Sequence, residues 1–330
     1  MMNTLEVIAP GLHTTVQDPG RFGHQDIGVP ASGPLDRISF RLANALVGNR
    51  PDTPALEMLL QGPTLRVLAD SMRLALVGCS AGMEMRSSTS IIIPAGQSAQ
   101  LAKGDVVRIG PLGDSVCAYL AIEGGLDVAT VLGSASTYVR GALGGFQGRR
   151  LQKGDSLPLK RGAVDTRGEY ALRRPLDLAL NQSIRVVLGP QVDYFTDDAV
   201  ATLLSSEYVV SPQADRMGFR LDGPTLAHAK GYNIISDGIV PGSIQVPGSG
   251  RPIILMVDNQ TTGGYPKIAT VISADIPVVG RRRPGRSIRF TAVDVHEAEG
   301  LRREQETAIL DELNSLRVVD PVVPGSSGPA

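Results

Sequence analysis

The sequence contains no tryptophan and few aromatic residues of any kind, which make up 4% of its 330 positions. Cysteine is almost as scarce, because only Cys79 and Cys117 occur. Each cysteine lies within an apolar run, which predicts a buried, reduced thiol rather than a disulfide. The four histidines show no metal-ligand spacing with one another or with the cysteines, so we predict no metal site.

A strong net charge is also missing, since 32 Lys and Arg residues balance 33 Asp and Glu residues. This balance argues against a nucleic-acid partner and against an anionic membrane surface. No apolar run reaches the length of a transmembrane helix. The first six residues lack the basic and apolar regions of a signal peptide. We therefore expect a cytoplasmic protein with no nucleic-acid and no membrane partner.

Three motifs of nucleotide, acyl-transfer and carboxyl-carrier chemistry are absent. No Gly-x-x-x-x-Gly-Lys-Ser/Thr loop occurs, so the chain is not predicted to be a P-loop ATPase. No Gly-x-Ser-x-Gly nucleophile elbow occurs. The chain also has no Ala-Met-Lys-Met-type segment, so we do not expect it to carry its own biotin.

Glycine and proline, in contrast, are abundant, with 38 and 23 residues. They are spread between short apolar runs, which is typical of a mainly β protein with many turns. The expected strands include Leu5–Ile8, Thr64–Leu68, Arg73–Val77, Ser90–Ile93, Val106–Ile109, Val116–Ile122, Ile184–Leu188, Tyr208–Val210, Asn233–Ile235, Ile253–Val257, Ala269–Ile272 and Ser287–Val293.

Three segments are predicted to be helical. Pro34–Val47 would begin with proline at its first position, and Asp197–Leu204 follows Thr196 as an N-cap. Residues 295–317 carry opposite charges four positions apart, as at Glu299 and Arg303, which is typical of a solvated helix face.

The length predicts about two domains. Gly62-Pro63-Thr64-Leu65 recurs half a chain later as Gly223-Pro224-Thr225-Leu226, which favours a duplicated β-barrel unit. The predicted organisation is a first barrel region at 1–160, a linker at 161–176, a second barrel region at 177–294, a C-terminal helix at 295–317 and a flexible tail at 318–330, with the option that the barrels exchange strands.

The densest group of polar residues follows the apolar strand Ile253–Val257. Gly263 and Gly264 allow close backbone approach and expose N–H groups. Thr261 and Thr262 offer hydroxyl groups, and Lys267 offers a positive charge for a carboxylate or phosphate. Asp258 could act as a base or orient a lysine. The same residue types also fit a tight β-turn whose Asp and Thr side chains cap backbone groups.

Two further polar segments stand out. Asp215 and Arg216 lie beside a glycine turn and could present a guanidinium to a carboxylate, or they could serve a structural ion pair. The N-terminal segments Thr14–Arg21 and Gly28–Asp36 form the other group. Asp36 lies in the first turn of a predicted helix, where a carboxylate suits the helix dipole.

Together these segments resemble the allophanate hydrolase subunit 2 family, which includes the KipA proteins, the C subunits of 5-oxoprolinases and the carboxyltransferase half of urea carboxylase. The matching stretches follow the family's order over about residues 5–290. They are Thr15–Gly20, Gly28–Asp36, Arg41–Asn44, Ala55–Glu57, Asp215–Leu221, Pro241–Gly248 and Asp258–Lys267.

The resemblance implies two cyclophilin-like β-barrel domains and a hydrolase that is active only in a heteromeric complex. The partners would be a subunit 1 (KipI-like) protein and a third, LamB/YcsF-like protein. The complex would use ATP, bound on a component that the sequence does not identify, to open the small cyclic amide 5-oxo-L-proline to L-glutamate. Catalytic roles are expected for Asp258, Lys267 and Arg216. Substrate binding is expected from Gln245, Thr261, Thr262, Gly263, Gly264, Tyr265 and Asp215.

The family leaves two alternatives open. One is a biotin-dependent carboxyltransferase that acts on urea or a related amide. The other is a non-catalytic KipA-type regulator that binds a KipI-like kinase inhibitor. One departure from the family pattern is Arg281-Arg282-Arg283, which replaces a Gln-Leu-type segment before Pro284-Gly285 and could change an interface or a substrate preference.

Overall fold

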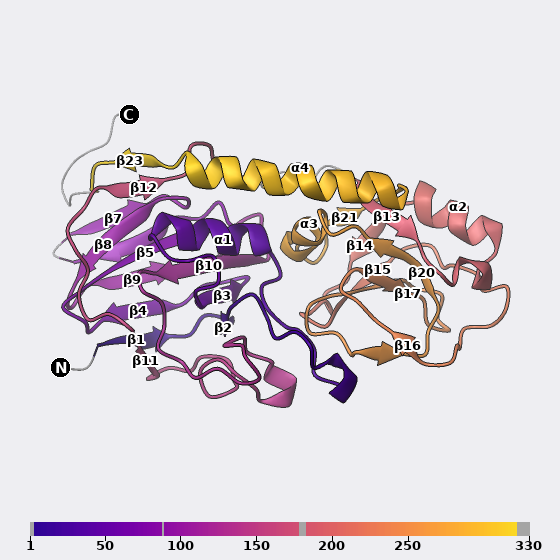
Figure 1. Ribbon diagram of the computed structural model, residues 1–330, viewed down its shortest axis with the longest axis horizontal. Helices are drawn as coiled ribbons and strands as arrows, with labels where there is room; N and C mark the ends of the chain where they lie inside the picture. The colour runs from indigo at the N-terminus through magenta and orange to yellow at the C-terminus, as the bar shows by residue number, and fades with distance from the viewer. Residues whose placement is uncertain (1–2, 88, 178–182, 322–330) are drawn as a thin grey trace. The chain divides into compact units, whose positions relative to one another are not determined.

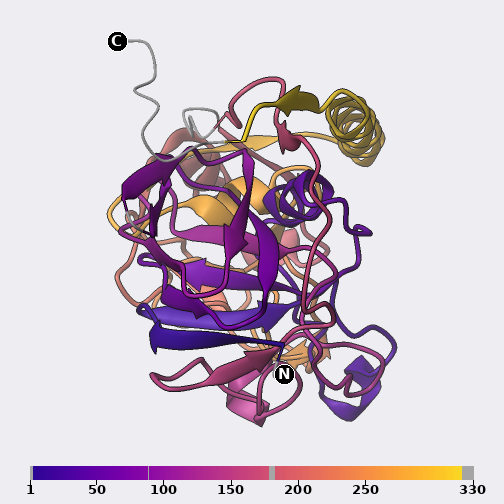
Figure 2. The ribbon, with the colours of Figure 1, turned by 90° about the vertical axis from the view of Figure 1, so that its left-hand side faces the viewer.

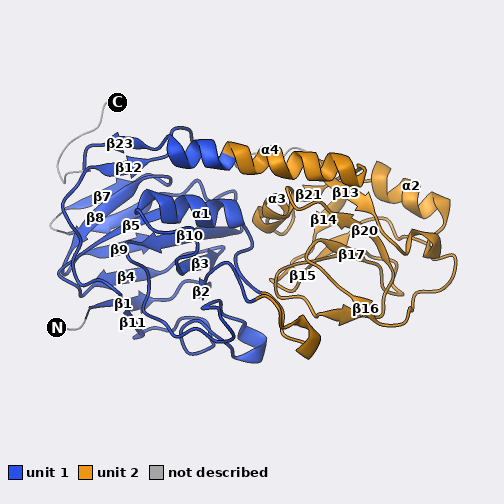
Figure 3. Ribbon diagram, in the orientation of Figure 1, with its two compact units in different colours: residues 1–21, 32–178, 309–330 blue, residues 22–31, 179–308 orange. Residues whose placement is uncertain are grey.

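The structure, a computed structural model, describes residues 3–87, 89–177 and 183–321 (Figure 1). The chain forms two compact units (Figure 3). Unit 1 comprises residues 1–21, 32–178 and 309–330, and unit 2 comprises residues 22–31 and 179–308. The domain boundaries expected from the sequence stay predictions. Residues 322–330 of the expected flexible tail lie outside the described residues.

Unit 1 contains two antiparallel sheets. The first has the strand order β11-β1-β4-β9-β6-β7, and the second has the order β2-β3-β10-β5-β8. The strands of the first sheet are β1 (Thr4–Ala9), β4 (Thr64–Val67), β6 (Met83–Arg86), β7 (Ser90–Ile93), β9 (Val106–Ile109) and β11 (Ser156–Pro158). Those of the second are β2 (His13–Gln17), β3 (Ala55–Leu59), β5 (Ser71–Val77), β8 (Ser98–Ala102) and β10 (Cys117–Ile122).

The core of unit 1 lies between these sheets. Leu65 and Val107 of the first sheet and Leu56, Leu74 and Leu120 of the second belong to one apolar cluster, and all five are fully buried. Two sheets that pack face to face bury alternate side chains in this way. Cys79 and Cys117 are both buried thiols that form no disulfide, as predicted. Burial raises the pKa of the Cys79 thiol to about 12.

Helix α1 (Arg37–Leu46) packs on β5 and β10 of the second sheet (Figure 2). Its N-cap is Asp36, whose Oδ1 accepts hydrogen bonds from the backbone N–H groups of Ile38 and Ser39. This cap satisfies two of the amides that a helix start leaves without partners. The predicted helix is confirmed, but Pro34 lies before it rather than at its first position.

A two-stranded sheet joins distant parts of unit 1. Strand β12 (Glu169–Ala171) lies within the stretch expected to be a linker, and it pairs with β23 (Arg317–Val319). Buried Arg73 of β5 donates hydrogen bonds to the carboxylate of Glu169 at 3.0 and 3.1 Å. The segment 161–176 is thus tied to the second sheet through a charged side-chain contact. Helix α4 (Val295–Asn314) precedes β23 and confirms the predicted C-terminal helix.

Unit 2 is built on an eight-stranded sheet of order β21-β14-β15-β18-β17-β20-β13-β22. The two end strands, β21 (Ser287–Ile288) and β22 (Phe290–Ala292), are separated only by Arg289. Because both edges of the sheet are adjacent in the chain, the sheet nearly closes into a barrel. The remaining strands are β13 (Ile184–Leu188), β14 (Tyr208–Val210), β15 (Gly218–Asp222), β17 (Ser243–Gln245), β18 (Ile253–Leu255) and β20 (Lys267–Val271).

Unit 2 also has a two-stranded sheet of β16 (Asp237–Gly238) and β19 (Thr262–Gly263). Its helices are α2 (Asp197–Ser205), α3 (Ile276–Arg281) and the part of α4 up to Ala308. Helix α2 is capped by Thr196, as predicted, since the Thr196 hydroxyl accepts from the N–H of Ala199. Short 3-10 turns occur at Gln25–Ile27 and Val192–Tyr194 in unit 2 and at Val139–Gly141 in unit 1.

One predicted strand is wrong. The run Asn233–Ile235 forms no strand, and Ile235 is 93% exposed. Its apolar residues have no sheet neighbour to pack on, although Ile234 donates one backbone hydrogen bond to Gly264. The expected mainly β fold with short helices and a C-terminal helix is otherwise confirmed. Within the described part of the chain, every helix is too short or too polar to span a bilayer.

Candidate functional site

The polar segment after β18 is fixed by backbone hydrogen bonds to the segment before β15. Met256 donates to the carbonyl of Met217, and Asp258 donates to that of Arg216, each at 2.9 Å. These bonds extend the β15–β18 pairing beyond the strands themselves. The Arg216 and Asp258 side chains therefore leave the backbone next to each other.

Arg216 and Asp258 form a buried, two-pronged ion pair. Nε of Arg216 donates to Oδ2 of Asp258 at 2.8 Å, and Nη2 donates to Oδ1 at 3.1 Å. The two side chains are only 4% and 8% exposed. Each carboxylate oxygen accepts a hydrogen bond from the guanidinium group, which is the bidentate geometry that arginine favours with carboxylates. This arrangement holds two loops together, and it pairs Asp258 with an arginine rather than with a lysine. The role of Asp258 as a base or as an orienting carboxylate stays a prediction.

Asp215 uses its side chain within its own turn. Its Oδ1 accepts hydrogen bonds from the backbone N–H groups of Met217 at 2.8 Å and Gly218 at 3.2 Å. An Asp side chain that bonds two and three residues ahead closes a common type of turn. The role of Asp215 as a substrate ligand stays a prediction.

Lys267 opens β20 and is buried, whereas its partner Asp237 is half exposed. Nζ of Lys267 donates to Oδ2 of Asp237 at 2.5 Å and to the carbonyl of Gly238 at 3.0 Å. The side chain of Lys267 is 6% exposed and that of Asp237 is 50% exposed. An ammonium group has three N–H donors. The third has no hydrogen-bond partner among the residues that the structure describes, so Lys267 has a donor left for a ligand.

Gln191 holds the same pair from a third segment. Its Nε2 donates to Oδ2 of Asp237 at 3.2 Å, and its Oε1 accepts from the backbone N–H of Lys267 at 3.2 Å. The hydrogen bond from Lys267 lowers the pKa of the Asp237 carboxyl, with help from the backbone N–H of Gly238. Asp237 is therefore ionised at neutral pH and keeps Lys267 oriented.

Gln245 connects this lysine to the glycine segment. Gln245 faces Lys267 in the β17–β20 pairing, and its Nε2 donates to the carbonyl of Tyr265 at 3.3 Å. A Cβ atom on Gly263 would lie 2.6 Å from Nε2 of Gln245 and 2.6 Å from Cδ1 of Ile239. A larger residue at position 263 would therefore force the ends of the Gln245 and Ile239 side chains to move.

The remaining predicted ligands lie around the two-stranded sheet. Thr262 is exposed and pairs with Gly238, and the carbonyl of Thr261 accepts from the N–H of Ile239 at 3.0 Å. The carbonyl of Gly264 accepts from Ile234 at 2.9 Å. Tyr265 is 39% exposed. These residues form a polar, partly open surface beside the Lys267–Asp237 pair.

The structure therefore joins the predicted residues into two groups. Lys267 and Gln245 belong with the Thr262–Tyr265 segment, while Arg216 belongs with Asp258. Asp237 and Gln191 complete the first group and are absent from the sequence-based set of site residues. Asp237 could have been found, since Ser236-Asp237-Gly238 is a short polar segment that precedes the same apolar strand. Nothing in the sequence singles out Gln191 as a site residue, because it lies far from Lys267 along the chain.

The N-terminal polar segment in unit 1 has a structural role. The Asp18 carboxylate accepts hydrogen bonds from the hydroxyls of Ser134 and Ser136 and from the backbone N–H groups of Gly20 and Ala135. Four donors on one buried carboxylate tie two loops together and leave little capacity for a ligand. With the N-cap role of Asp36, this accounts for both acidic residues of the segment.

Of the three arginines that depart from the family pattern, Arg281 is the last residue of α3, and Arg282 and Arg283 follow it. Arg281 and Arg282 are buried, at 4% and 6% exposure. Burial and the nearby guanidinium groups of Arg281 and Arg286 lower the pKa of Arg282. An effect of these arginines on an interface or on substrate preference stays a prediction. No group of three or more His, Cys, Asp and Glu side chains in the described ranges is arranged to hold a metal ion.

Comparison with known proteins identifies the family to which the chain belongs. The model of the carboxyltransferase domain, subdomains A and B, matches residues 27–292. The chain belongs to this carboxyltransferase-domain family. The match confirms the resemblance indicated by the sequence motifs, and it spans most of both units, including every residue of the two polar groups.

Individual relatives extend over nearly the whole chain. The C subunit of the 5-oxoprolinase of Escherichia coli K12 is 36% identical over 302 residues, which cover 92% of this chain and 95% of that protein. The corresponding C subunit of Haemophilus influenzae 5-oxoprolinase is 35% identical over 324 residues, covering 96% and 99%. The crystal structure of the K. lactis urea amidolyase superposes with a TM-score of 0.84 at 32% identity. It covers 94% of this chain but only 20% of that protein.

Proposed function

We propose that this chain is the C-type subunit of an ATP-dependent 5-oxoprolinase that opens 5-oxo-L-proline to L-glutamate. The observation that carries the proposal is the end-to-end match to two bacterial 5-oxoprolinase subunits, in which the matched stretches cover 95% and 99% of the relatives' own lengths. The urea amidolyase match, in contrast, involves one-fifth of a much longer chain.

The Lys267 group is suited to bind the amide of such a substrate. Opening of a lactam places negative charge on the carbonyl oxygen, and pre-oriented N–H donors stabilise that charge. Lys267 is held by Asp237 and Gly238 and has one N–H donor to spare among the described residues. Because it is largely buried, its attraction for an oxyanion is less weakened by water than that of an exposed lysine. We assign Lys267 to the amide oxygen, with Thr262 and Tyr265 at the rim.

Arg216 and Asp258 are assigned to positioning. Their buried ion pair fixes the start of the polar segment 258–267 against the segment before β15. A shift of about 1 Å in a catalytic group can reduce turnover by roughly 100-fold. Loss of the pair would therefore lower turnover by displacing the segment that carries the substrate-binding residues. Asp258 as the reaction's base stays the sequence-based alternative.

The proposal includes partners that the chain itself does not contain. A subunit 1 (KipI-like) protein and a LamB/YcsF-like protein would complete the enzyme. ATP enters as a co-substrate of the complex, and no residue of this chain is assigned to it.

Reconstitution tests this function. The purified chain is combined with its subunit 1 and LamB/YcsF-like partners, ATP and 5-oxo-L-proline, and L-glutamate and ADP are measured. We expect both products only when all three proteins are present. Full turnover by the two partners without this chain would contradict the proposal and would favour the regulatory alternative.

A second candidate is a biotin-dependent carboxyltransferase for urea or a related amide. It is favoured by the structural match to urea amidolyase over 94% of the chain. Consumption of carboxybiotin in the presence of urea, without glutamate formation from 5-oxo-L-proline, would identify this activity instead.

A further inference from the structure

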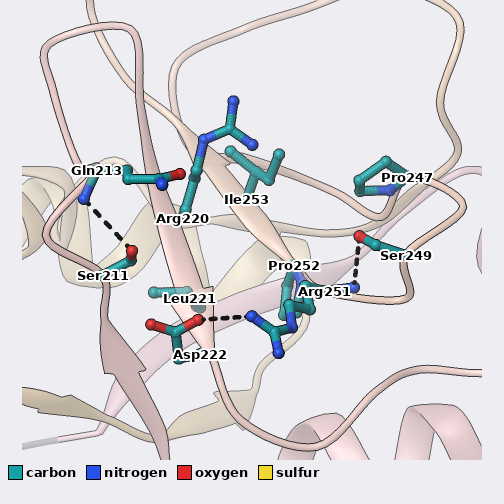
Figure 4. Close-up of a pocket in the computed structure, with 10 residues that line it drawn as sticks. All are labelled: Ser211, Gln213, Arg220, Leu221, Asp222, Pro247, Ser249, Arg251, Pro252 and Ile253. Atoms are coloured by element: carbon teal, nitrogen blue, oxygen red, sulfur yellow. Dashed lines mark hydrogen bonds and ion pairs between the residues drawn. The ribbon is translucent and has the colours of Figure 1, made fainter.

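A pocket of about 330 Å³ lies in unit 2, beside β15 (Figure 4). Its walls come from β14–β15 and from the loop between β17 and β18. The lining residues are Ser211, Gln213, Arg220, Leu221, Asp222, Pro247, Ser249, Arg251, Pro252 and Ile253. None of Lys267, Asp237, Arg216 and Asp258 lines it. Its volume is at the lower end of the range for small-molecule sites.

Arg220 is the unusual member of this lining. It lies opposite Ile253 in the β15–β18 pairing, with its side chain on the exposed face. Its guanidinium makes no hydrogen bond or ion pair to any described residue, whereas the other pocket arginine, Arg251, is bound to Asp222 at 3.0 Å. The two arginines and one aspartate give the pocket lining one net positive charge. The N–H donors of the Arg220 guanidinium are available to a ligand.

Neutral polar groups surround this positive charge. The Gln213 side chain points toward Arg220 in Figure 4, and its amide has no partner in the described part of the chain. The hydroxyl of Ser211 accepts from the N–H of Gln213 at 3.3 Å, which leaves the hydroxyl proton to donate. A guanidinium and nearby amide and hydroxyl donors match the oxygens of a carboxylate or phosphate.

The wall opposite Arg220 is rigid. Gly250 donates to the carbonyl of Pro247 at 2.9 Å, Leu226 donates to that of Gly250 at 2.9 Å, and Leu221 donates to that of Pro252 at 3.0 Å. The two prolines also fix their own backbone φ angles. The loop is therefore held in shape before any ligand arrives, which reduces the ordering cost of binding.

We propose that this pocket binds a small oxyanion, with the Arg220 guanidinium as its principal ligand and Gln213 and Ser211 as neutral donors. The ligand is a small molecule that carries a carboxylate or phosphate group. The site is independent of the amide-binding role assigned to Lys267, so it can be tested on the isolated chain without partner subunits or turnover.

Calorimetric titration of the full chain at constant ionic strength tests the site, with succinate and inorganic phosphate as separate probes. We expect saturable binding of at least one probe at millimolar or lower concentration, and the better probe identifies the oxyanion. Arg220→Gln should weaken binding at least tenfold. The matched control Arg289→Gln changes another exposed arginine of unit 2, which pairs with Glu207 outside the pocket, and should leave binding unchanged.

Gln213→Leu provides a second variant should Arg220→Gln fail to fold, and we expect it to weaken binding severalfold. Absence of saturable binding for both probes would overturn the proposal. Equal weakening by Arg220→Gln and Arg289→Gln would also overturn it, because it would indicate a general charge effect. Since no turnover is measured, a negative result here leaves the 5-oxoprolinase proposal untouched, and the reverse also holds.

Discussion

At the scale of single residues, the two buried cations of the candidate site, Arg216 and Lys267, have different surroundings. Arg216 forms two hydrogen bonds to the buried carboxylate of Asp258. Lys267 pairs with the half-exposed carboxylate of Asp237 and retains one N–H donor that has no partner among the described residues. The first arrangement is suited to hold loops and the second to meet a ligand. This contrast leads to different expectations for the two side chains.

Arg216→Ala should destabilise the protein by about 3 kcal/mol, because it leaves the buried Asp258 charge without its partner. The double variant Arg216→Met/Asp258→Leu should recover much of that loss, since neither charge remains buried. Arg289→Ala, which breaks an exposed pair, should cost no more than about 1 kcal/mol. Urea titration of the full chain measures all three. A double variant as unstable as Arg216→Ala would show that the pair is not the source of the effect.

The Lys267–Asp237 pair should make stability depend on pH at the acidic end. The pKa of Asp237 is lowered in the folded state, so its contribution is complete above the ordinary Asp pKa of about 4. It is lost as the pH falls through the lowered value. Asp237→Asn should therefore lower the melting temperature near neutral pH, and the difference from wild type should shrink below pH 4. A difference that is constant from pH 7 to pH 2 would contradict the ion pair.

Several of these residues could be predicted from the sequence, and others could not. Lys267, Gly263 and Asp258 stand in one polar stretch after an apolar strand, so their local pattern is visible. Their partners are different. Asp237 is 30 positions from Lys267, and Arg216 is 42 positions from Asp258. Only the pairing of strands brings these residues together, and residue types along the chain do not encode that pairing directly.

At the scale of elements, most apolar runs mark strands because alternate residues reach a core. The run Asn233–Ile235 shows the limit of that rule, since it has the composition of a strand but no neighbour to pair with. The repeated Gly-Pro-Thr-Leu sequence shows another limit. Thr64 opens β4, whereas Thr225 follows β15 in a segment without strand structure. The repeat therefore does not mark equivalent strands of the two units.

Gly189 follows β13 and controls how closely this part of the chain approaches β20. A Cβ atom there would lie 2.2 Å from the carbonyl oxygen of Lys267, a backbone atom that cannot rotate away. Gly189→Ala should cost about 2 kcal/mol or more by forcing the strands apart. Gly238→Ala, with open space around its Cβ position, should cost less than about 0.5 kcal/mol. Thermal unfolding compares them, and similar melting temperatures would contradict the close approach.

Gly300 lies within α4 and has open space where a Cβ atom would be. Gly300→Ala should stabilise the protein by about 0.5–1 kcal/mol, because alanine loses less backbone freedom on entering a helix. Denaturant unfolding should show a higher midpoint with an unchanged slope. A lower midpoint would indicate that the glycine serves a contact rather than only the helix.

At the scale of the whole molecule, both units belong to one chain that matches bacterial 5-oxoprolinase subunits from end to end. The mainly β architecture followed from composition and short apolar runs. The closure of the unit 2 sheet could not be predicted from the same features, because it depends on β21 and β22 lying at opposite edges of the sheet. The Lys267 group is built on that sheet, with β17 and β20 as its support.

The most direct measurement is ATP-dependent glutamate formation from 5-oxo-L-proline by the reconstituted complex containing Lys267→Met. We expect turnover to fall by roughly 100-fold or more, as for loss of one oxyanion-stabilising donor, while assembly with the partners is unchanged. The matched control is Lys230→Met, which breaks a pair with Asp193 whose two side chains are each 56% exposed. It should retain wild-type turnover. Equal turnover by the Lys267→Met and Lys230→Met complexes would contradict the assignment of Lys267 to the reacting amide.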